Sequence, residues 1–342
     1  MVLLVVLITG ATRNLGSVHT RNLISKEGLN GKDIRFLAMP NENIDDLKAL
    51  HLEPFIGDLQ YPETLKGIMK DVTTVYHLAA ITVNESVSRE VMMQVNVKGT
   101  EVLIEEFLKE NTTEKFVYAS TLGVHGFDFP NYPINEEYAL NPQNNYQESK
   151  LLGEKYLLNC STENGIDATA IRNSLIVGPY DTLTSARVAT GLLDGQIVYL
   201  GKGQNKFSMV DGRDCSKAMI MTTKNKIAKG KAYNIKSFDI TQRDYFNCYA
   251  ECCGGCYPKR TIPKWLANLF AWFKEKTTPE GQEVLVTRTR IHRYTSNRML
   301  DTTKIETELG YTPDFSDPTI TINDAVQWLK DNNYLDHPKL TG

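Results

Sequence analysis

VLLVVLITGATRNLG, residues 2–16, joins an apolar run to a turn of small residues and then to a helical pattern. The uninterrupted apolar run at residues 2–8 is typical of a strand buried on both faces of a parallel sheet. After it, Gly10 permits a tight turn, and Gly16 permits a helix to pack closely against the strand. Such a turn lets backbone N–H groups approach a pyrophosphate, although an ordinary strand-to-helix turn is the alternative.

The first half of the chain alternates short apolar runs with helical patterns. Strands are predicted at residues 2–8, 34–38, 54–57, 72–79, 115–120 and 168–172. Helices are predicted at residues 15–27, 62–70 and 91–108, and a further helix starts near Asn145. This alternation predicts βαβ units, which right-handed crossovers build into a doubly wound, Rossmann-like parallel sheet of the α/β class.

The second half is less regular and predicts a smaller, mostly helical C-terminal substrate domain that is interleaved with the first. Residues 175–206 hold several glycines and are expected to be rich in loops, whereas 213–225 is a predicted helix and 232–235 a returning strand. The predicted dinucleotide-binding domain comprises 1–174 with 209–236, and the substrate-binding domain 175–208 with 237–342. An aromatic cluster, which we interpret as core, is formed by Trp265, Phe270, Trp272 and Phe273.

The composition is that of an ordinary globular chain of 342 residues with a formal net charge of -3. No overall positive field favours nucleic acid. No apolar run is long enough to span a membrane, and the N-terminal run lacks the basic leader and cleavage site of a signal peptide. We therefore expect a cytoplasmic protein that acts on a small molecule, with neither nucleic acid nor membrane as partner.

Four of the six cysteines crowd together, at Cys248, Cys252, Cys253 and Cys256. The spacing of the last two is similar to that of metal ligands. No histidine lies nearby and no second separated pair completes a site. A helix over about 242–252 that ends at Gly254-Gly255 explains the cluster more simply, so we expect no metal.

Three further strand ends carry side chains suited to a cofactor crevice. Asp58 follows the third strand, where a carboxylate can accept the amine of an adenine, although Gly-Asp pairs also form plain turns. The small residues after His77 leave room at the end of the fourth strand, although a core role is the simpler alternative. The fifth strand ends in Ser120-Thr121, whose hydroxyls could bind substrate or merely cap a helix.

Tyr146 and Lys150 are four residues apart, which places them on one helix face. A free tyrosine has a pKa near 10, and a nearby ammonium lowers that pKa by stabilising the phenolate. Tyr146 could then exchange a proton with a C–OH/C=O couple as a hydride moves. A surface pair is the alternative.

Taken in order, these motifs resemble the extended short-chain dehydrogenases/reductases, the superfamily of NAD-dependent epimerases and dehydratases, over nearly the whole chain. Further points of resemblance are Asn96-Val97-Lys98-Gly99-Thr100, Val124-His125-Gly126, Val210-Asp211-Gly212-Arg213-Asp214 and Leu309-Gly310-Tyr311-Thr312-Pro313. The segment 261–265 is most similar to the branch that contains dihydroflavonol reductases and 3β-hydroxysteroid dehydrogenases.

The resemblance implies roles for particular residues. Tyr146 is the acid, Lys150 lowers its pKa and holds the nicotinamide ribose, Thr121 orients the carbonyl, and Asn96 helps relay protons through a water. The implied cofactor contacts are Gly10, Thr12, Arg13, Asn14, Leu15, Gly16, Asp58, Leu59, Leu78, Ala79, Ala80, Ala119, Ser120, Tyr146, Lys150, Asn173, Leu175 and Ile176. The family also implies a homodimer paired through the helices at 91–108 and 145–158.

The chain departs from the family in ways that bear on the cofactor. Arg13 and Asn14 stand where a middle glycine is usual, and residues 39–41 lack the acidic residue that binds a ribose 2′-hydroxyl. A guanidinium binds a 2′-phosphate well, so we favour NADP(H). NAD(H) remains the alternative, because Glu42 could take the acidic role. Asn173 replaces the usual proline, and His125 replaces a tyrosine.

Three functions compete. The first is an NADP(H)-dependent carbonyl reductase or alcohol dehydrogenase. The second is a nucleotide-sugar epimerase or dehydratase, weakened because Leu122-Gly123 replaces the Asp-Glu pair of dehydratases and Asn205 replaces an arginine that holds a diphosphate. The third is a cofactor-binding sensor without catalysis, which the intact Tyr146–Lys150 pair disfavours. The sequence favours the first.

Overall fold

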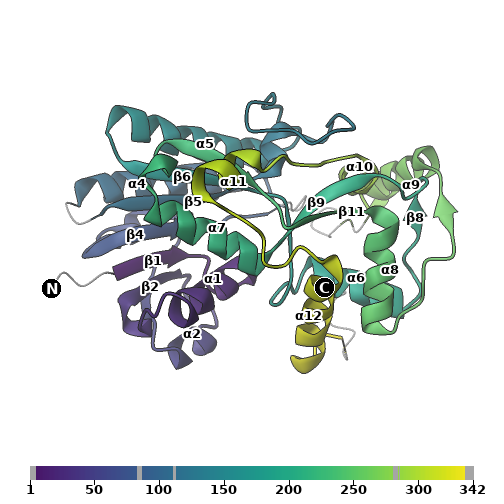
Figure 1. The fold of residues 1–342 in the computed structure, drawn as a ribbon, viewed down its shortest axis with the longest axis horizontal. Helices are drawn as coiled ribbons and strands as arrows, with labels where there is room; N and C mark the ends of the chain where they lie inside the picture. Colours follow the sequence, from purple (N-terminus) through teal and green to yellow (C-terminus); the bar gives the residue numbers. More distant parts are fainter. Residues whose placement is uncertain (1–4, 83–86, 111–112, 280–283, 285, 336–342) are drawn as a thin grey trace.

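Over the residues that the structure describes, the centre of the larger lobe is a seven-stranded parallel sheet (Figure 1). The computed structural model describes residues 5–82, 87–110, 113–279, 284 and 286–335, so residues 2–4 of the predicted first strand lie outside it. In spatial order the strands are β10 (Lys231–Ile235), β6 (Asp167–Asn173), β5 (Lys115–Thr121), β4 (Val72–His77), β1 (Val5–Thr9), β2 (Ile34–Ala38) and β3 (Glu53–Ile56). The order reverses between β1 and β4, where open α/β sheets bind their ligands.

Helices cover both faces of this sheet (Figure 1). One face carries α1 (Asn14–Ser25), α7 (Gly212–Lys224) and α11 (Thr303–Leu309), and the other carries α4 (Gly99–Lys109) and α5 (Asn145–Glu163). Strand β1 serves both cores, because successive side chains of a strand point to opposite faces. Val6 and Ile8 pack with the first group of helices, and Val5 and Leu7 pack with the second. The continuous apolar run of the sequence therefore follows from burial on both sides.

Short helices complete the larger lobe. They are η1 (Gly31–Asp33), α2 (Asp45–Ala49), η2 (Pro62–Leu65), α3 (Arg89–Met93), the π-helical η3 (Gln94–Lys98), η4 (Leu122–His125) and η5 (Lys226–Ala228). The helix predicted at 62–70 is reduced to the single 3-10 turn η2, because Gly67 adopts a positive φ of 79° soon after it. The helix predicted at 91–108 is interrupted by the π-helical turn η3.

The smaller lobe has its own core. It contains β7 (Leu175–Val177), β9 (Lys206–Asp211) and β11 (Phe238–Thr241) in one sheet, the pair β8 (Tyr199–Leu200) and β12 (Thr261–Ile262), and the helices α6 (Thr184–Leu193), α8 (Gln242–Cys253), α9 (Lys264–Thr277), α10 (Arg288–Thr295) and α12 (Pro318–Asp331). Helix α8 ends at Gly254, which has φ 73°, as predicted. The division of the chain into two domains remains a prediction, and α11 packs in the core of the larger lobe through Ile305.

The predicted loops of the smaller lobe are present, but its predicted aromatic core is not. The segment 175–206 is rich in loops, and it also contains α6, which buries Ala186, Ala189 and Leu192. The aromatic cluster is not core, because α9 buries only its small face, at Ala267 and Ala271, and turns its large side chains outward. None of the described helices is long and apolar enough to cross a bilayer.

Candidate active site

The glycine turn between β1 and α1 forms a cradle without side chains. A Cβ atom on Gly10 would lie 2.8 Å from the backbone nitrogen of Ala79, and one on Gly16 would lie 1.9 Å from the carbonyl oxygen of Gly10. Asn14 adopts a positive φ of 33°, a conformation that asparagine tolerates better than most residues, so the turn forms without a glycine at this position. The N-cap residue Arg13 makes no side-chain capping bond with the described part of α1, an arrangement that suits an anion at the start of this helix.

The carboxylate of Glu42 faces this turn. It accepts a hydrogen bond from the Thr12 hydroxyl (2.5 Å) and another from the backbone nitrogen of Met39 (3.0 Å). Strand β2 ends at Ala38, and a turn closed by the hydrogen bond from the Glu42 nitrogen to the Met39 carbonyl follows it. This turn, rather than a longer strand, places Glu42 beside Thr12. Arg13 is exposed, and its side chain makes no hydrogen bond or ion pair with a described residue.

Asp58 and Leu59 lie in the loop between β3 and η2. The Asp58 carboxylate accepts a hydrogen bond from the backbone of Gln60 (2.8 Å), so part of its hydrogen-bonding capacity closes its own loop. Leu59 is buried. A Cβ atom on Gly99 would lie 2.8 Å from the Cβ atom of Leu59. The glycine of Asn96-Val97-Lys98-Gly99-Thr100 is therefore needed for the contact between α4 and this loop.

A chain of hydrogen bonds runs from the cofactor side of the site to the middle of η3. The Ala79 backbone nitrogen donates to the Thr9 hydroxyl (3.1 Å), which bonds Nδ1 of His77 (2.6 Å). The other ring nitrogen of His77 bonds the Thr100 hydroxyl (2.8 Å), which donates to the Asn96 carbonyl (2.7 Å). Burial lowers the His77 pKa to about 3, so the ring is neutral and can donate at one nitrogen and accept at the other.

The Asn96 side chain forms three hydrogen bonds within the protein. Its amide nitrogen donates to the Ile81 carbonyl (2.9 Å) and to the Ser149 hydroxyl (3.0 Å), and its oxygen accepts from the Ile81 nitrogen (2.8 Å). It thereby joins the segment after β4 to α5. Its implied role in proton relay remains a prediction.

Tyr146 and Lys150 lie in the first part of α5, which Asn144 caps by accepting from the Gln147 nitrogen (2.9 Å). Burial raises the pKa of Tyr146, while Arg293 and a hydrogen bond with Thr121 act in the opposite direction. Burial also lowers the pKa of Lys150 to about 7, against the pull of Glu154. The lowered tyrosine pKa expected from Lys150 is therefore absent here, because desolvation of the phenolate is the largest effect.

The two hydroxyl residues at the end of β5, Ser120 and Thr121, have different hydrogen-bond partners. The Thr121 hydroxyl accepts from the Gly123 nitrogen (3.1 Å) and acts to lower the pKa of Tyr146. Ser120 instead donates to Glu154, and its carbonyl accepts from the Asn173 amide (3.1 Å). The side chains of Ser120 and Asn173 are thus turned into the protein, and any cofactor contact from them must use other atoms.

The remaining predicted contacts line the same sheet edge. Ala119 is buried near the end of β5, and Leu78, Ala79 and Ala80 are half-buried beyond β4. Leu175 and Ile176 are half-buried in β7, directly after β6. The parallel register, with Thr9 beside His77 and Thr121 beside Asn173, gathers these residues at the carboxyl edge.

Near Tyr146 and Lys150 lies a buried ion pair that sequence reasoning did not identify. Arg172 donates to Oε1 of Glu154 (2.6 Å from Nη2 and 3.1 Å from Nε) and to its Oε2 (3.3 Å from Nε). It also donates to the Glu136 carbonyl (2.9 Å). Its Nη1 lies 3.3 Å from Nε2 of His125, whose pKa is lowered to about 4 chiefly by burial. No pattern in the sequence pairs residues 18 positions apart on a helix and a strand.

Two arginines that follow one another closely in sequence were also missed. Arg293 of α10 acts electrostatically on Tyr146, and it acts on Arg298 as well. Arg298 is buried, its Nε has no hydrogen-bond partner among the described residues, and its pKa is lowered to about 9, mainly by burial. The run of basic residues at 288–298 was the available signal.

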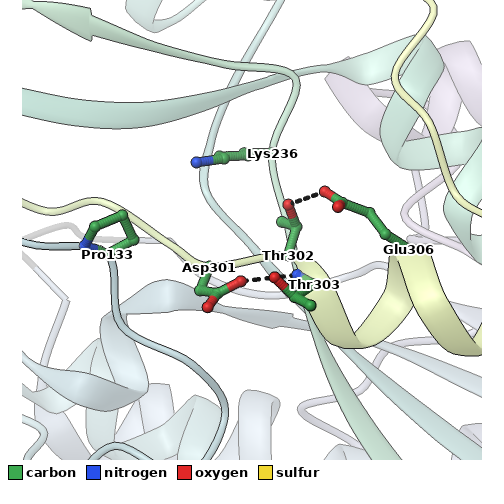
Figure 2. Close-up of a pocket in the computed structure, with 6 residues that line it drawn as sticks. All are labelled: Pro133, Lys236, Asp301, Thr302, Thr303 and Glu306. Carbon is green, nitrogen blue, oxygen red and sulfur yellow. Dashed lines mark hydrogen bonds between the residues drawn. The ribbon is translucent and has the colours of Figure 1, made fainter.

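A separate surface hollow lies beside β10 and α11 (Figure 2). Its lining residues are Pro133, Lys236, Asp301, Thr302, Thr303 and Glu306. The polar groups satisfy one another: Thr302 donates to Glu306 (2.6 Å), and the Thr303 nitrogen donates to Asp301 (2.8 Å). None of the predicted site residues lines it, so we assign it no catalytic role.

Fold and site together define a class: a Rossmann-fold protein of the extended short-chain dehydrogenase/reductase type. Residues 6–235 match the profile of the "NAD dependent epimerase/dehydratase family", and the chain belongs to this family.

Three known proteins illustrate the similarity. "Sterol demethylase protein B" of Methylococcus capsulatus is 25% identical over 340 residues, which are 96% of this chain and 99% of that protein. "Sterol-4-alpha-carboxylate 3-dehydrogenase, decarboxylating" of Mus musculus is 27% identical over 64% of this chain and 62% of its own length. The structure of the dTDP-glucose 4,6-dehydratase DesIV of Streptomyces venezuelae with NAD bound has a TM-score of 0.76 at 21% identity, covering 96% of this chain and 97% of that one.

Proposed function

We propose that this protein is an oxidoreductase that transfers a hydride between a nicotinamide dinucleotide and a carbonyl or secondary alcohol carbon of a small organic substrate. The observation that carries the proposal is that Thr121 acts on the pKa of Tyr146, which lies one helical turn before the buried Lys150. The raised pKa of Tyr146 keeps its phenol protonated at neutral pH, as an acid requires.

The residues present fit a dinucleotide. The turn at Gly10 and Gly16 has no room for side chains and exposes N–H groups, which suits a pyrophosphate. When bound, the dinucleotide supplies the hydride chemistry. Thr121 then orients the substrate oxygen, Tyr146 donates its proton to that oxygen, and Lys150 as an ammonium stabilises the phenolate that remains.

The choice of dinucleotide depends on two residues. Arg13 supports NADP(H), because a guanidinium pairs with a 2′-phosphate. Glu42 supports NAD(H), because two hydrogen bonds hold its carboxylate at the end of β2, where it would repel a 2′-phosphate. Since Glu42 is fixed and Arg13 is exposed, the arrangement favours NAD(H), with NADP(H) as the alternative.

The substrate is proposed to carry an anionic group. Arg298 is buried and forms no ion pair with a described residue, and it interacts electrostatically with Arg293, which in turn acts on Tyr146. Burying an unpaired charge is costly, so an arrangement of this kind suits an anion that arrives with the substrate. The relative named for a sterol carboxylate and its 3-dehydrogenation supports a lipophilic hydroxy or keto acid.

The test is a set of paired assays with both dinucleotides, using a neutral ketone, the matching keto acid and a panel of nucleotide sugars. Turnover of the ketones, with a lower KM for the keto acid, is expected. Arg293→Ala should raise the KM for the keto acid about tenfold or more, because a charge-assisted pair is lost. The KM for the neutral ketone should stay unchanged. Arg288→Ala is the matched control, because Arg288 pairs with Glu275 away from the site. Epimerisation of a nucleotide sugar without ketone turnover would overturn the proposal.

Epimerisation of a nucleotide sugar is the second candidate, since the family contains such enzymes. One observation counts against it. Asn205, which stands in place of an arginine that holds a diphosphate, donates to the Tyr294 and Ser296 carbonyls (2.7 and 3.3 Å) and is engaged in packing α10. The third candidate, a sensor without catalysis, is disfavoured by the presence of Tyr146 and Lys150 on one face of α5, with Thr121 acting on Tyr146.

A further inference from the structure

Helix α9 carries its large apolar side chains on the outside of the smaller lobe. Trp265, Leu269 and Phe273 are 69%, 55% and 56% exposed, and Leu266, Phe270 and Trp272 are also exposed. At 3.6 residues per turn, these six side chains occupy an arc of roughly 160° on one side of the helix. The opposite side, Ala267 and Ala271, packs with Ile291 of α10.

A contiguous face of this kind is unusual for a surface that stays in water. Single exposed apolar residues are common, but clustered ones mark an interaction site. Tryptophan and phenylalanine on a helix with small residues on its inner side are typical of helices that lie in a membrane interface.

Charge identifies the partner more closely. Residues 257–276 hold five Lys or Arg and one Glu, a net charge of +4, whereas the whole chain has -3, so the remainder has -7. The five cations are Lys259, Arg260, Lys264, Lys274 and Lys276, all exposed, and none forms an ion pair with a described residue. The one acid, Glu275, is already paired with Arg288 (2.7 Å). The face is therefore a basic, aromatic patch on an acidic protein.

Charged residues of α9 and α10 connect the start of α9 with the candidate active site. Lys264, at the start of α9, acts electrostatically on Asp128, which accepts a hydrogen bond from His292 of α10 (3.1 Å). The next residue of α10, Arg293, acts on Tyr146. Figure 1 shows α9 and α10 together at the outer end of the smaller lobe.

We propose that the exposed face of α9, with its basic flank, docks on the surface of a lipid bilayer that contains anionic lipids. The helix has 14 residues, too few to cross a bilayer, so it lies in the plane of the interface. The proposal departs from the sequence-based expectation that no membrane is a partner, which considered spanning segments alone. It does not depend on the proposed reaction.

The test is co-sedimentation of the full chain with vesicles of phosphatidylcholine, with and without phosphatidylglycerol, in the absence of substrate. We expect binding to the anionic vesicles that weakens as salt is added. Trp265→Ala/Phe270→Ala should reduce binding about tenfold or more, because two large side chains lose their apolar contacts. Lys274→Glu/Lys276→Glu should reduce it by a similar factor on anionic vesicles.

Ile320→Ala is the matched control, because Ile320 is 50% exposed on α12 and should leave binding unchanged. Far-ultraviolet circular dichroism establishes that each variant is folded. Failure of the parent protein to bind anionic vesicles overturns the proposal, as does equal binding by the aromatic variant. If the parent does not bind vesicles and Trp265→Ala/Phe270→Ala has a lower mass in solution than the parent by light scattering, the face would instead be assigned to contact with a second copy of the chain. Vesicle binding by a protein that reduces no ketone would leave this proposal standing while the proposed function fails.

Discussion

The ammonium of Lys150, in the first part of α5, lies 3.9 Å from the centre of the Tyr118 ring. The aromatic face offers a buried cation some compensation, but desolvation still lowers the pKa of Lys150 to about 7. Lysine is charged below its pKa, so Lys150 changes its charge close to neutral pH in the free protein.

We expect kcat/KM for the dinucleotide to fall as pH rises through about 7, because the ammonium needed to hold the ribose and the phenolate is lost. A pH profile measures this directly. In Lys150→Arg the fall near neutrality should disappear, because arginine stays charged. Lys155→Arg, at an exposed position of the same helix, should retain the parent profile. A parent profile that is flat through this range would contradict the assignment.

Tyr146→Phe should lower kcat by roughly two to four decades, the usual contribution of a positioned acid. Binding of the dinucleotide, measured by calorimetry, should be nearly unchanged. Tyr132→Phe serves as the control, since Tyr132 is 64% exposed. Substantial activity in Tyr146→Phe would remove this residue from the mechanism.

Glu154→Gln should lower the free energy of unfolding by about 3–5 kcal/mol, because it leaves the buried Arg172 without its charge partner. Urea denaturation measures the change. Arg89→Ala breaks an exposed pair with Glu148 and should cost less than about 1 kcal/mol. Equal effects of the two substitutions would show that burial does not set the strength of the inner pair.

Glu42→Gln should improve kcat/KM with NADP(H) relative to NAD(H) by roughly tenfold, since it removes the negative charge that faces a 2′-phosphate. Arg13→Ala should lower kcat/KM with NADP(H) only, by on the order of tenfold to a hundredfold, if the guanidinium binds that phosphate. An equal loss with both dinucleotides would assign Arg13 to the pyrophosphate. A parent preference for NADP(H) would reinstate the preference predicted from sequence.

The family resemblance predicts a homodimer that pairs through the helices at 91–108 and 145–158, which overlap α4 and α5 in the structure. Leu108 and Leu152 are 38% and 41% exposed on these helices, which suits a partly apolar interface. Light scattering should give twice the mass of one chain, and Leu152→Arg should shift it toward one. Leu193→Arg, at a residue 40% exposed on α6, should not. A single-chain mass for the parent at micromolar concentration would contradict the dimer.

The sequence by itself determined the sheet and the glycine turn, because both depend on local pattern. Continuous apolar runs predict strands buried on two faces, and Gly10 and Gly16 are required wherever backbones approach this closely. The spacing of Tyr146 and Lys150 also predicted their shared helix correctly.

Only the tertiary structure decided what surrounds these residues. Glu42 reaches Thr12, and Glu154 reaches Arg172, through contacts between elements whose distance no local pattern encodes. The pKa of Tyr146 rose rather than fell because burial, a property of the whole fold, outweighed its neighbours. The aromatic residues of α9 gave the same periodicity as a core helix, but the side that packs inward is set by Ala267, Ala271 and their partner Ile291. A periodic pattern defines the faces of a helix, and only packing determines which face meets the protein.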